Sequence, residues 1–155
     1  MGQQPSTPTV KITDIEQLLS TGHAIQIHPR GYSMYPLFVP GRDEAIISPL
    51  PPTGTSRLKR GDIVLYRRAG SILVLHRIFK ITKSGIYLVG DNQTEVEGPL
   101  AHSQVRGILT SFIRKGREVS VHHPLYVLYS HVWLLFRPFR HKIADFIHFF
   151  RQKAK

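Results

Sequence analysis

The stretch that decides the fold is residues 61–92, which read GDIVLYRRAGSILVLHRIFKITKSGIYLVGDN. Three apolar, β-branched runs cover residues 62–67, 72–81 and 86–89, and short glycine-containing segments separate them. Runs of this length and composition, bounded by turn residues, are typical of β-strands. We therefore predict a β-meander of three strands.

Further short strands are predicted on both sides of the meander. Residues 24–28 alternate apolar and polar side chains, as a strand with one buried face does, and residues 44–48 form another short strand. Residues 107–113 and 118–122 are predicted to form a hairpin around Lys115-Gly116.

A short helix is predicted near the N-terminus. Thr13 and Glu16 have the spacing of a capping box, in which each side chain bonds a free backbone N–H of the first turn. The helix should end near Ser20. Residues 1–10 look like a flexible tail, and they lack the basic and apolar regions of a secretory signal.

The pattern becomes helical from Pro124 onward, and Pro138 should break the helix. A set of apolar residues at helical spacing predicts an amphipathic face: Phe139, Ile143, Phe146, Ile147 and Phe150. The apolar stretch 124–136 has 13 residues, whereas a membrane-spanning helix needs about 18 or more. We predict three parts: a tail over 1–10, a β domain over 11–123 and a basic helical segment over 124–155.

The chain has 155 residues, enough for one domain with a buried core, and a net charge of +11. Residues 114–155 carry +7 of that charge. An anionic membrane surface is therefore a candidate partner of the C-terminal helix, and the alternative is a helix packed on the β domain with a solvated basic face. The absence of cysteine excludes disulfides, a cysteine nucleophile and thiolate zinc sites.

One serine lies in a turn bounded by glycine and proline. Residues 31–36 read GYSMYP, with Ser33 two positions after Gly31 and three before Pro36. Such turns can expose a hydroxyl and direct backbone N–H groups to one point, which suits a nucleophile with an oxyanion hole. The alternative is an ordinary turn serine.

A polar pair interrupts the second run of the meander. Residues 73–78 read LVLHRI, and strand alternation places His76 on the face of Val74 and Ile78, which predicts that it points inward. An imidazole, with an ordinary pKa of about 6.5, is suited to removing a proton from a serine hydroxyl. The alternative is a core histidine with satisfied hydrogen bonds.

Acidic residues follow the meander. Residues 89–97 read VGDNQTEVE, and this segment supplies carboxylates that could orient His76, as the acid does in a Ser-His-acid arrangement. The alternative is that Gly90, Asp91 and Asn92 form a simple turn.

Together these segments resemble the signal peptidase-like serine peptidases, a family that includes the self-cleaving SOS repressors. The family order is Gly-x-Ser-Met-x-Pro, Gly-Asp-Ile-Val, a base at the start of a strand, and Gly-Asp-Asn. The matching segments are 31–36, 61–64, 76–78 and 90–92, within a resemblance that covers about residues 13–113. It implies a mostly β (α+β) fold: a coiled antiparallel sheet or partial barrel of the signal peptidase and SOS-repressor C-terminal type, with a short N-terminal helix.

The resemblance implies a serine endopeptidase that needs no metal or other cofactor. Ser33 matches the nucleophile, and His76 matches the base of the archaeal and endoplasmic-reticulum branch, where bacterial signal peptidases have lysine. Asp91 matches the aspartate of Gly-Asp-Asn. The acid assigned in that branch falls six residues later, at Glu97, where this chain has glutamate in place of aspartate. Either Asp91 or Glu97 is expected to support His76.

The expected substrate is a leader or signal-like segment of a peptide or preprotein. Residues 1–32 show no apolar segment of the kind that anchors a chain in a membrane, and residues 41–44, GRDE, depart from the Gly-Asp that usually follows the serine motif. By analogy, these features favour a dedicated processing enzyme, in the cytoplasm or attached peripherally to a membrane, over a general preprotein signal peptidase.

Two other function classes remain open: a catalytically inactive member of the family, and a basic binding or regulatory module. The charge favours a nucleic-acid partner. However, the sequence shows no helix-turn-helix, RNP-like or zinc motif, so no nucleic-acid partner is expected.

Overall fold

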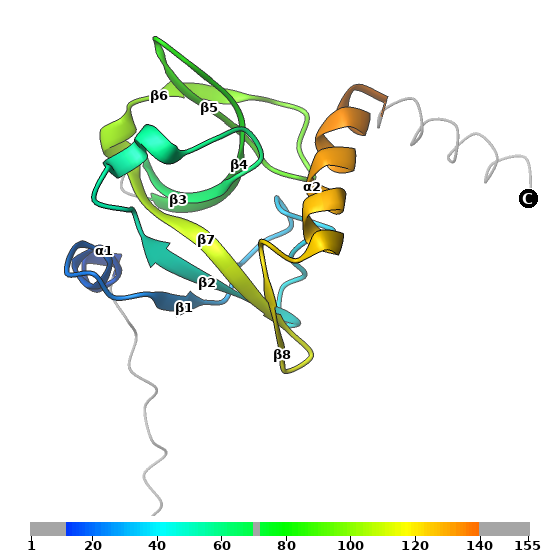
Figure 1. The fold of residues 1–155 in the computed structure, drawn as a ribbon, viewed down its shortest axis with the longest axis horizontal. Coiled ribbons are helices and arrows are strands. Elements are labelled where there is room, and N and C mark those ends of the chain that lie inside the picture. Colours follow the sequence, from blue (N-terminus) through cyan, green and yellow to red (C-terminus); the bar gives the residue numbers. More distant parts are fainter. Residues whose placement is uncertain (1–11, 70–71, 140–155) are drawn as a thin grey trace, which may run out of the picture.

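Eight strands form one antiparallel sheet in the computed structural model, which describes residues 12–69 and 72–139 (Figure 1). The strands are β1 (Ile25–Ile27), β2 (Asp43–Pro49), β3 (Ile63–Arg68), β4 (Ile72–Thr82), β5 (Gly85–Val89), β6 (Glu97–Leu100), β7 (Val105–Arg114) and β8 (Arg117–Ser120). The helices are α1 (Ile12–Ser20) and α2 (Pro124–Phe136), with 3-10 turns η1 (Gly54–Arg57), η2 (His102–Gln104) and η3 (Arg137–Phe139).

The order of the strands across the sheet is β1-β2-β7-β3-β4-β5-β6, and β8 pairs with β7. The predicted meander is confirmed, because β3, β4 and β5 are antiparallel neighbours. The β7–β8 hairpin is also confirmed, and its turn places Lys115 and Gly116 at φ of 51° and 74°, the left-handed values that a two-residue hairpin turn requires. In the described part of the chain the sheet is not closed into a barrel.

One strand was not predicted. The sequence of β6, EGPL, contains glycine and proline, which are unfavourable in strands. Its pairing comes from the tertiary structure: Leu100 lies opposite Ile86 of β5. A Cβ on Gly98 would lie 2.8 Å from the carbonyl oxygen of Ile86, so this close approach of two backbones needs glycine.

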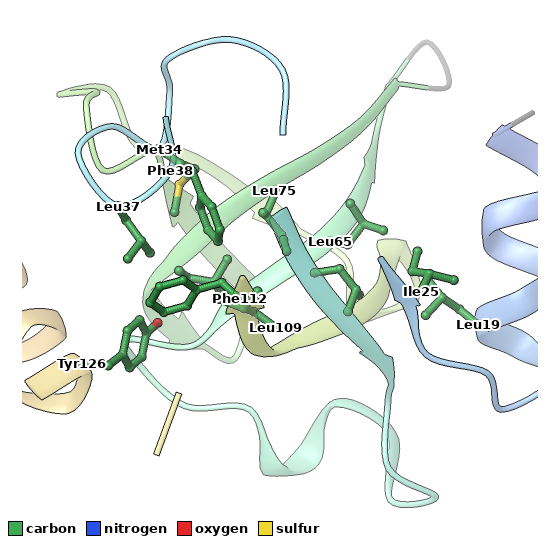
Figure 2. Close-up of a cluster of buried hydrophobic side chains, with 13 residues drawn as sticks. Leu19, Ile25, Met34, Leu37, Phe38, Leu65, Leu75, Leu109, Phe112 and Tyr126 are labelled. Atoms are coloured by element: carbon green, nitrogen blue, oxygen red, sulfur yellow. The ribbon is translucent and has the colours of Figure 1, made fainter. Parts of the chain in front are cut away.

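The buried apolar residues form two clusters. The first combines strand residues with Leu19 of α1, Tyr126 of α2 and three residues of the loop between β1 and β2, namely Met34, Leu37 and Phe38 (Figure 2). The second is built mainly on β3 to β7. The serine-containing loop is therefore anchored in the core and is not a free surface loop.

The start of the N-terminal helix differs from the prediction. The helix begins at Ile12, one residue before the predicted cap Thr13, and ends at Ser20 as predicted. Thr13 therefore lies inside the helix and not at the cap position that a capping box requires. Glu16 contacts the sheet. The carboxylate accepts hydrogen bonds from Arg67 of β3 and Arg106 of β7. Charge-assisted bonds to two guanidinium groups are stronger than one bond to a backbone N–H.

The C-terminal helix begins at Pro124, and the predicted break is confirmed because α2 gives way to η3, which contains Pro138. No described helix is long and apolar enough to cross a membrane. The predicted tail over 1–10 lies outside the described residues, as do Ile143, Phe146, Ile147 and Phe150 of the predicted amphipathic face.

Candidate active site

Ser33 is held in a loop whose next residue enters the core. Gly31 has a φ of 80°, a left-handed value that favours glycine. Met34 is buried in the first core cluster, whereas Tyr32 and Tyr35 are exposed. Ser33 itself is half-buried. Burial of Met34 therefore fixes the position of Ser33 relative to the core.

The Gly-Asp-Asn turn packs directly on this loop. The backbone N–H of Asn92 donates a hydrogen bond of 2.8 Å to the carbonyl oxygen of Ser33. A Cβ on Gly90 would lie 2.6 Å from the same oxygen, so the approach needs glycine. Two motifs far apart in the sequence are thus locked together through their backbones.

His76 lies on β4 and is 2% exposed, which confirms the predicted inward orientation. Ser33 and His76 line one cavity of about 490 Å³, whose walls include the apolar side chains of Ile27, Leu65 and Leu73. Within the described residues, no hydrogen bond joins the Ser33 hydroxyl to His76. In unliganded enzymes such bonds often form only when substrate binds.

The environment of His76 keeps its imidazole neutral. Burial lowers its pKa to about 4, because water no longer solvates the charged form. The Glu97 carboxylate opposes this shift and the Arg68 guanidinium adds to it. At neutral pH the ring is unprotonated on one nitrogen, as a general base must be.

Glu97 approaches His76 through a tyrosine. The Tyr66 hydroxyl lies 3.1 Å from His76 Nδ1 and 2.6 Å from Glu97 Oε2. The direct distance between Glu97 Oε2 and His76 Nδ1 is 3.9 Å. Arg68 donates from Nε to the other carboxylate oxygen at 2.8 Å, and this bond holds the pKa of Glu97 below its usual range.

Asp91 is engaged with a different partner. Arg77 donates two hydrogen bonds of 2.7 Å to its two carboxylate oxygens. Arg77 is 0% exposed and Asp91 is 1% exposed, so this is a dry, bidentate ion pair. Asp91 is also close enough to His76 to act on it electrostatically and opposes the lowering of its pKa.

The C-terminal helix closes over this ion pair. Ser130 of α2 accepts a hydrogen bond of 2.6 Å from Arg77 Nη1, and the Tyr129 hydroxyl donates to Asp91 Oδ2 at 3.3 Å. The Trp133 indole N–H donates to the Asp91 backbone carbonyl at 3.1 Å. In Figure 1, α2 lies beside the sheet, as these contacts require. The helix thus belongs to the support of the Gly-Asp-Asn turn.

The opposite side of α2 is apolar and exposed. Its exposed residues include Leu125, Leu128, Val132, Leu135 and Phe136. In the sequence, residues 137–155 carry six Lys or Arg and one acid. Contact of this segment with an anionic membrane stays a prediction.

The structure brings three of the four predicted residues to one region: Ser33 and His76 line the cavity, and Glu97 reaches His76 through Tyr66. Asp91 instead anchors the turn on which Ser33 rests. Sequence reasoning missed Tyr66, Arg68 and Arg77. The only available signal was the unusual occurrence of arginine inside an apolar strand, because an arginine buried there needs a carboxylate partner.

Comparison of the chain with protein-family models, curated proteins and solved structures found no match.

Proposed function

We propose that this protein is a serine endopeptidase of the signal peptidase-like type, which cleaves a leader or signal-like segment of a peptide or preprotein. One observation carries the proposal. Ser33 and His76 line one cavity, and the Gly-Asp-Asn turn is hydrogen-bonded to the Ser33 carbonyl. The partial-barrel fold of the signal peptidase and SOS-repressor C-terminal type is part of this proposal.

In the proposed reaction, Ser33 Oγ attacks the scissile carbonyl while His76 takes its proton. The backbone N–H of Ser33 stabilises the negative charge that develops on the carbonyl oxygen. The tetrahedral intermediate collapses to an acyl-enzyme when His76 gives the proton to the leaving amine. Water then attacks the ester with His76 again as the base, and Ser33 is regenerated.

Sheet topology supports an extended peptide as substrate. Residues 72–76 of β4 pair with β3, while the β5 pairing begins only at Arg77. β1 is the terminal strand of the sheet. Both segments contribute to the cavity wall, so unpaired backbone groups of an edge strand are available there to a bound peptide. The apolar walls suit the apolar side chains of a leader-like segment.

The test is cleavage of a mixed library of extended peptides, read by mass spectrometry. We expect cleavage by the wild type and none by Ser33→Ala or His76→Ala, with Ser56→Ala and His131→Ala as exposed-site controls that cleave normally. Unchanged cleavage by Ser33→Ala would overturn the proposal.

The other two function classes predict different results. An inactive scaffold binds peptides without cleaving them. A basic nucleic-acid-binding module leaves peptides intact and binds duplex DNA in a strongly salt-dependent way. Fluorescence anisotropy with a labelled peptide and a labelled duplex separates the two.

A further inference from the structure

We propose that Tyr66 is a positioning residue that sets the tautomer of His76, placing the ring proton on Nδ1 and leaving Nε2 free to act as the base. The inference rests on the proposed function for its catalytic meaning. Its structural content, the location of one proton on His76, stands on the contacts among Tyr66, Glu97 and Arg68.

The Tyr66 hydroxyl has two neighbours to which it could donate, His76 and Glu97. A phenolic hydroxyl has one proton and can donate only once. Tyr66 lies 2.6 Å from Glu97 Oε2, and Arg68 donates hydrogen bonds to both oxygens of that carboxylate. A carboxylate held by a guanidinium is ionised and can only accept. Tyr66 therefore donates to Glu97.

The hydrogen bond to Glu97 decides which nitrogen of His76 carries the proton. Because Tyr66 donates its only proton to Glu97, its oxygen can only accept from His76 Nδ1, which lies 3.1 Å away. Nδ1 must then carry hydrogen. A neutral imidazole has one N–H, so Nε2 holds a lone pair. The reverse arrangement, with Tyr66 donating to His76, would leave its oxygen and the carboxylate in contact without a proton between them.

In the proposed reaction, this tautomer leaves His76 Nε2 ready to accept the Ser33 proton. When Ser33 Oγ bonds to the acyl carbon, its proton moves to His76 Nε2 and the carbonyl electron pair moves to oxygen. The imidazolium then keeps its Nδ1–H directed at the Tyr66 oxygen, and the Glu97 charge lies behind that hydroxyl. Tyr66 keeps its own proton throughout. The acid thus stabilises the imidazolium at a distance of 3.9 Å, through a neutral group that also orients the ring.

The test is long-range ¹H–¹⁵N correlation NMR of the histidine rings in the full chain at pH 7. We expect His76 to show a protonated Nδ1 and an unprotonated Nε2. A protonated Nε2 in the wild type would overturn the inference, whether or not the protein cleaves peptides. The expected tautomer without any cleavage would support the inference and refute the proposed function.

Variants separate positioning from simple packing. In Tyr66→Phe we expect a mixture of the two tautomers and at least about 10-fold slower phosphonylation of Ser33 by a fluorophosphonate probe. Tyr87→Phe removes a hydroxyl that contacts Ser84 at the turn between β4 and β5, and it should change neither the tautomer ratio nor the rate. If Tyr66→Phe does not fold, Glu97→Gln serves instead, because loss of the charge weakens the same chain of hydrogen bonds. A wild-type tautomer ratio and rate in the folded variant would contradict the inference.

Discussion

His76 and Arg77 are consecutive residues of β4 that face opposite sides of the sheet, and the two sides are built differently. Arg77 binds Asp91 directly through two hydrogen bonds of 2.7 Å, and α2 covers the pair. His76 faces a cavity and reaches Glu97 only through the Tyr66 hydroxyl. We call the surroundings of Arg77 the closed side, because α2 covers them. We call the surroundings of His76 the open side, because this titratable side chain lines the cavity, whose wall also includes Leu65 and Leu73.

The difference has a physical basis. A buried ion pair contributes little net stability, because desolvation offsets the attraction, but loss of one partner leaves an unpaired buried charge. The Arg77–Asp91 pair therefore fixes the Gly-Asp-Asn turn against Ser33. A direct ion pair on the other side would have favoured a permanently charged His76, which could not accept a proton.

The first and largest expected effect is on the closed side. Arg77→Met leaves the Asp91 carboxylate buried without its main partner, so we expect the free energy of unfolding to fall by about 3–5 kcal/mol. Arg106→Met, at a partly exposed pair with Glu16, should cost about 1 kcal/mol or less. Urea unfolding measures both. Equal losses would mean that the two pairs are equivalent and would remove the contrast between the sides.

The second effect is a pH dependence of the open side. The pKa of His76 is about 4 in the folded protein, below its ordinary value, so the unfolded chain binds more protons between pH 4 and 6.5. Proton binding by the unfolded chain therefore lowers the free energy of unfolding as the pH falls through this window, by about 3 kcal/mol at pH 4. Between pH 7 and pH 4, the free energy of unfolding measured in urea should therefore fall by about 3 kcal/mol more in the wild type than in His76→Gln. Parallel losses would show that His76 is not held neutral.

The third effect is on the turn that links the two sides. Gly90→Ala would place a Cβ 2.6 Å from the Ser33 carbonyl oxygen, and Gly107→Ala would place one 2.6 Å from Ile47 Cγ2, away from Ser33. We expect each to lose about 1–3 kcal/mol by overpacking. Only Gly90→Ala should also slow fluorophosphonate labelling, measured well below both unfolding midpoints. If both variants are labelled at the same rate, the packing of the turn does not affect the reactivity of Ser33.

Much of this contrast could not be predicted from the sequence. Strand alternation correctly placed His76 inward, but alternation on one buried face also predicts an exposed Arg77, whereas both faces of β4 are covered at this point. The cover on the second face is α2, whose packing depends on contacts between residues more than 35 positions apart, such as Arg77 with Ser130 and Asp91 with Trp133. Periodicity cannot detect such contacts.

The candidate site was predictable to a similar extent. His76 stands out because it is a polar residue inside an apolar run, and Ser33 stands out because Gly31 and Pro36 bound its turn in the order of a family motif. Tyr66 does not stand out, since an aromatic residue in a strand is ordinary. Its role depends on the register that places β3 beside β4 and brings Glu97 within hydrogen-bond distance.

The smallest expected effect concerns the outer face of α2, whose inner face supports Asp91. Charge and exposed apolar surface predict that the intact chain binds vesicles containing anionic lipid and not neutral ones. Leu128→Glu should weaken flotation with anionic vesicles and leave the free energy of unfolding within about 0.5 kcal/mol of wild type. Absence of flotation by the wild type would dismiss membrane contact.

The most direct test of Ser33 as an activated nucleophile is intact-mass labelling with a fluorophosphonate probe, comparing wild type with Ser33→Ala and His76→Ala under conditions where all three are folded. We expect the wild type to form a single covalent adduct, which peptide mapping places on Ser33, and we expect neither variant to form it. An adduct that persists in Ser33→Ala, or a wild type that forms none at neutral or mildly alkaline pH with or without anionic vesicles, would contradict this role of Ser33.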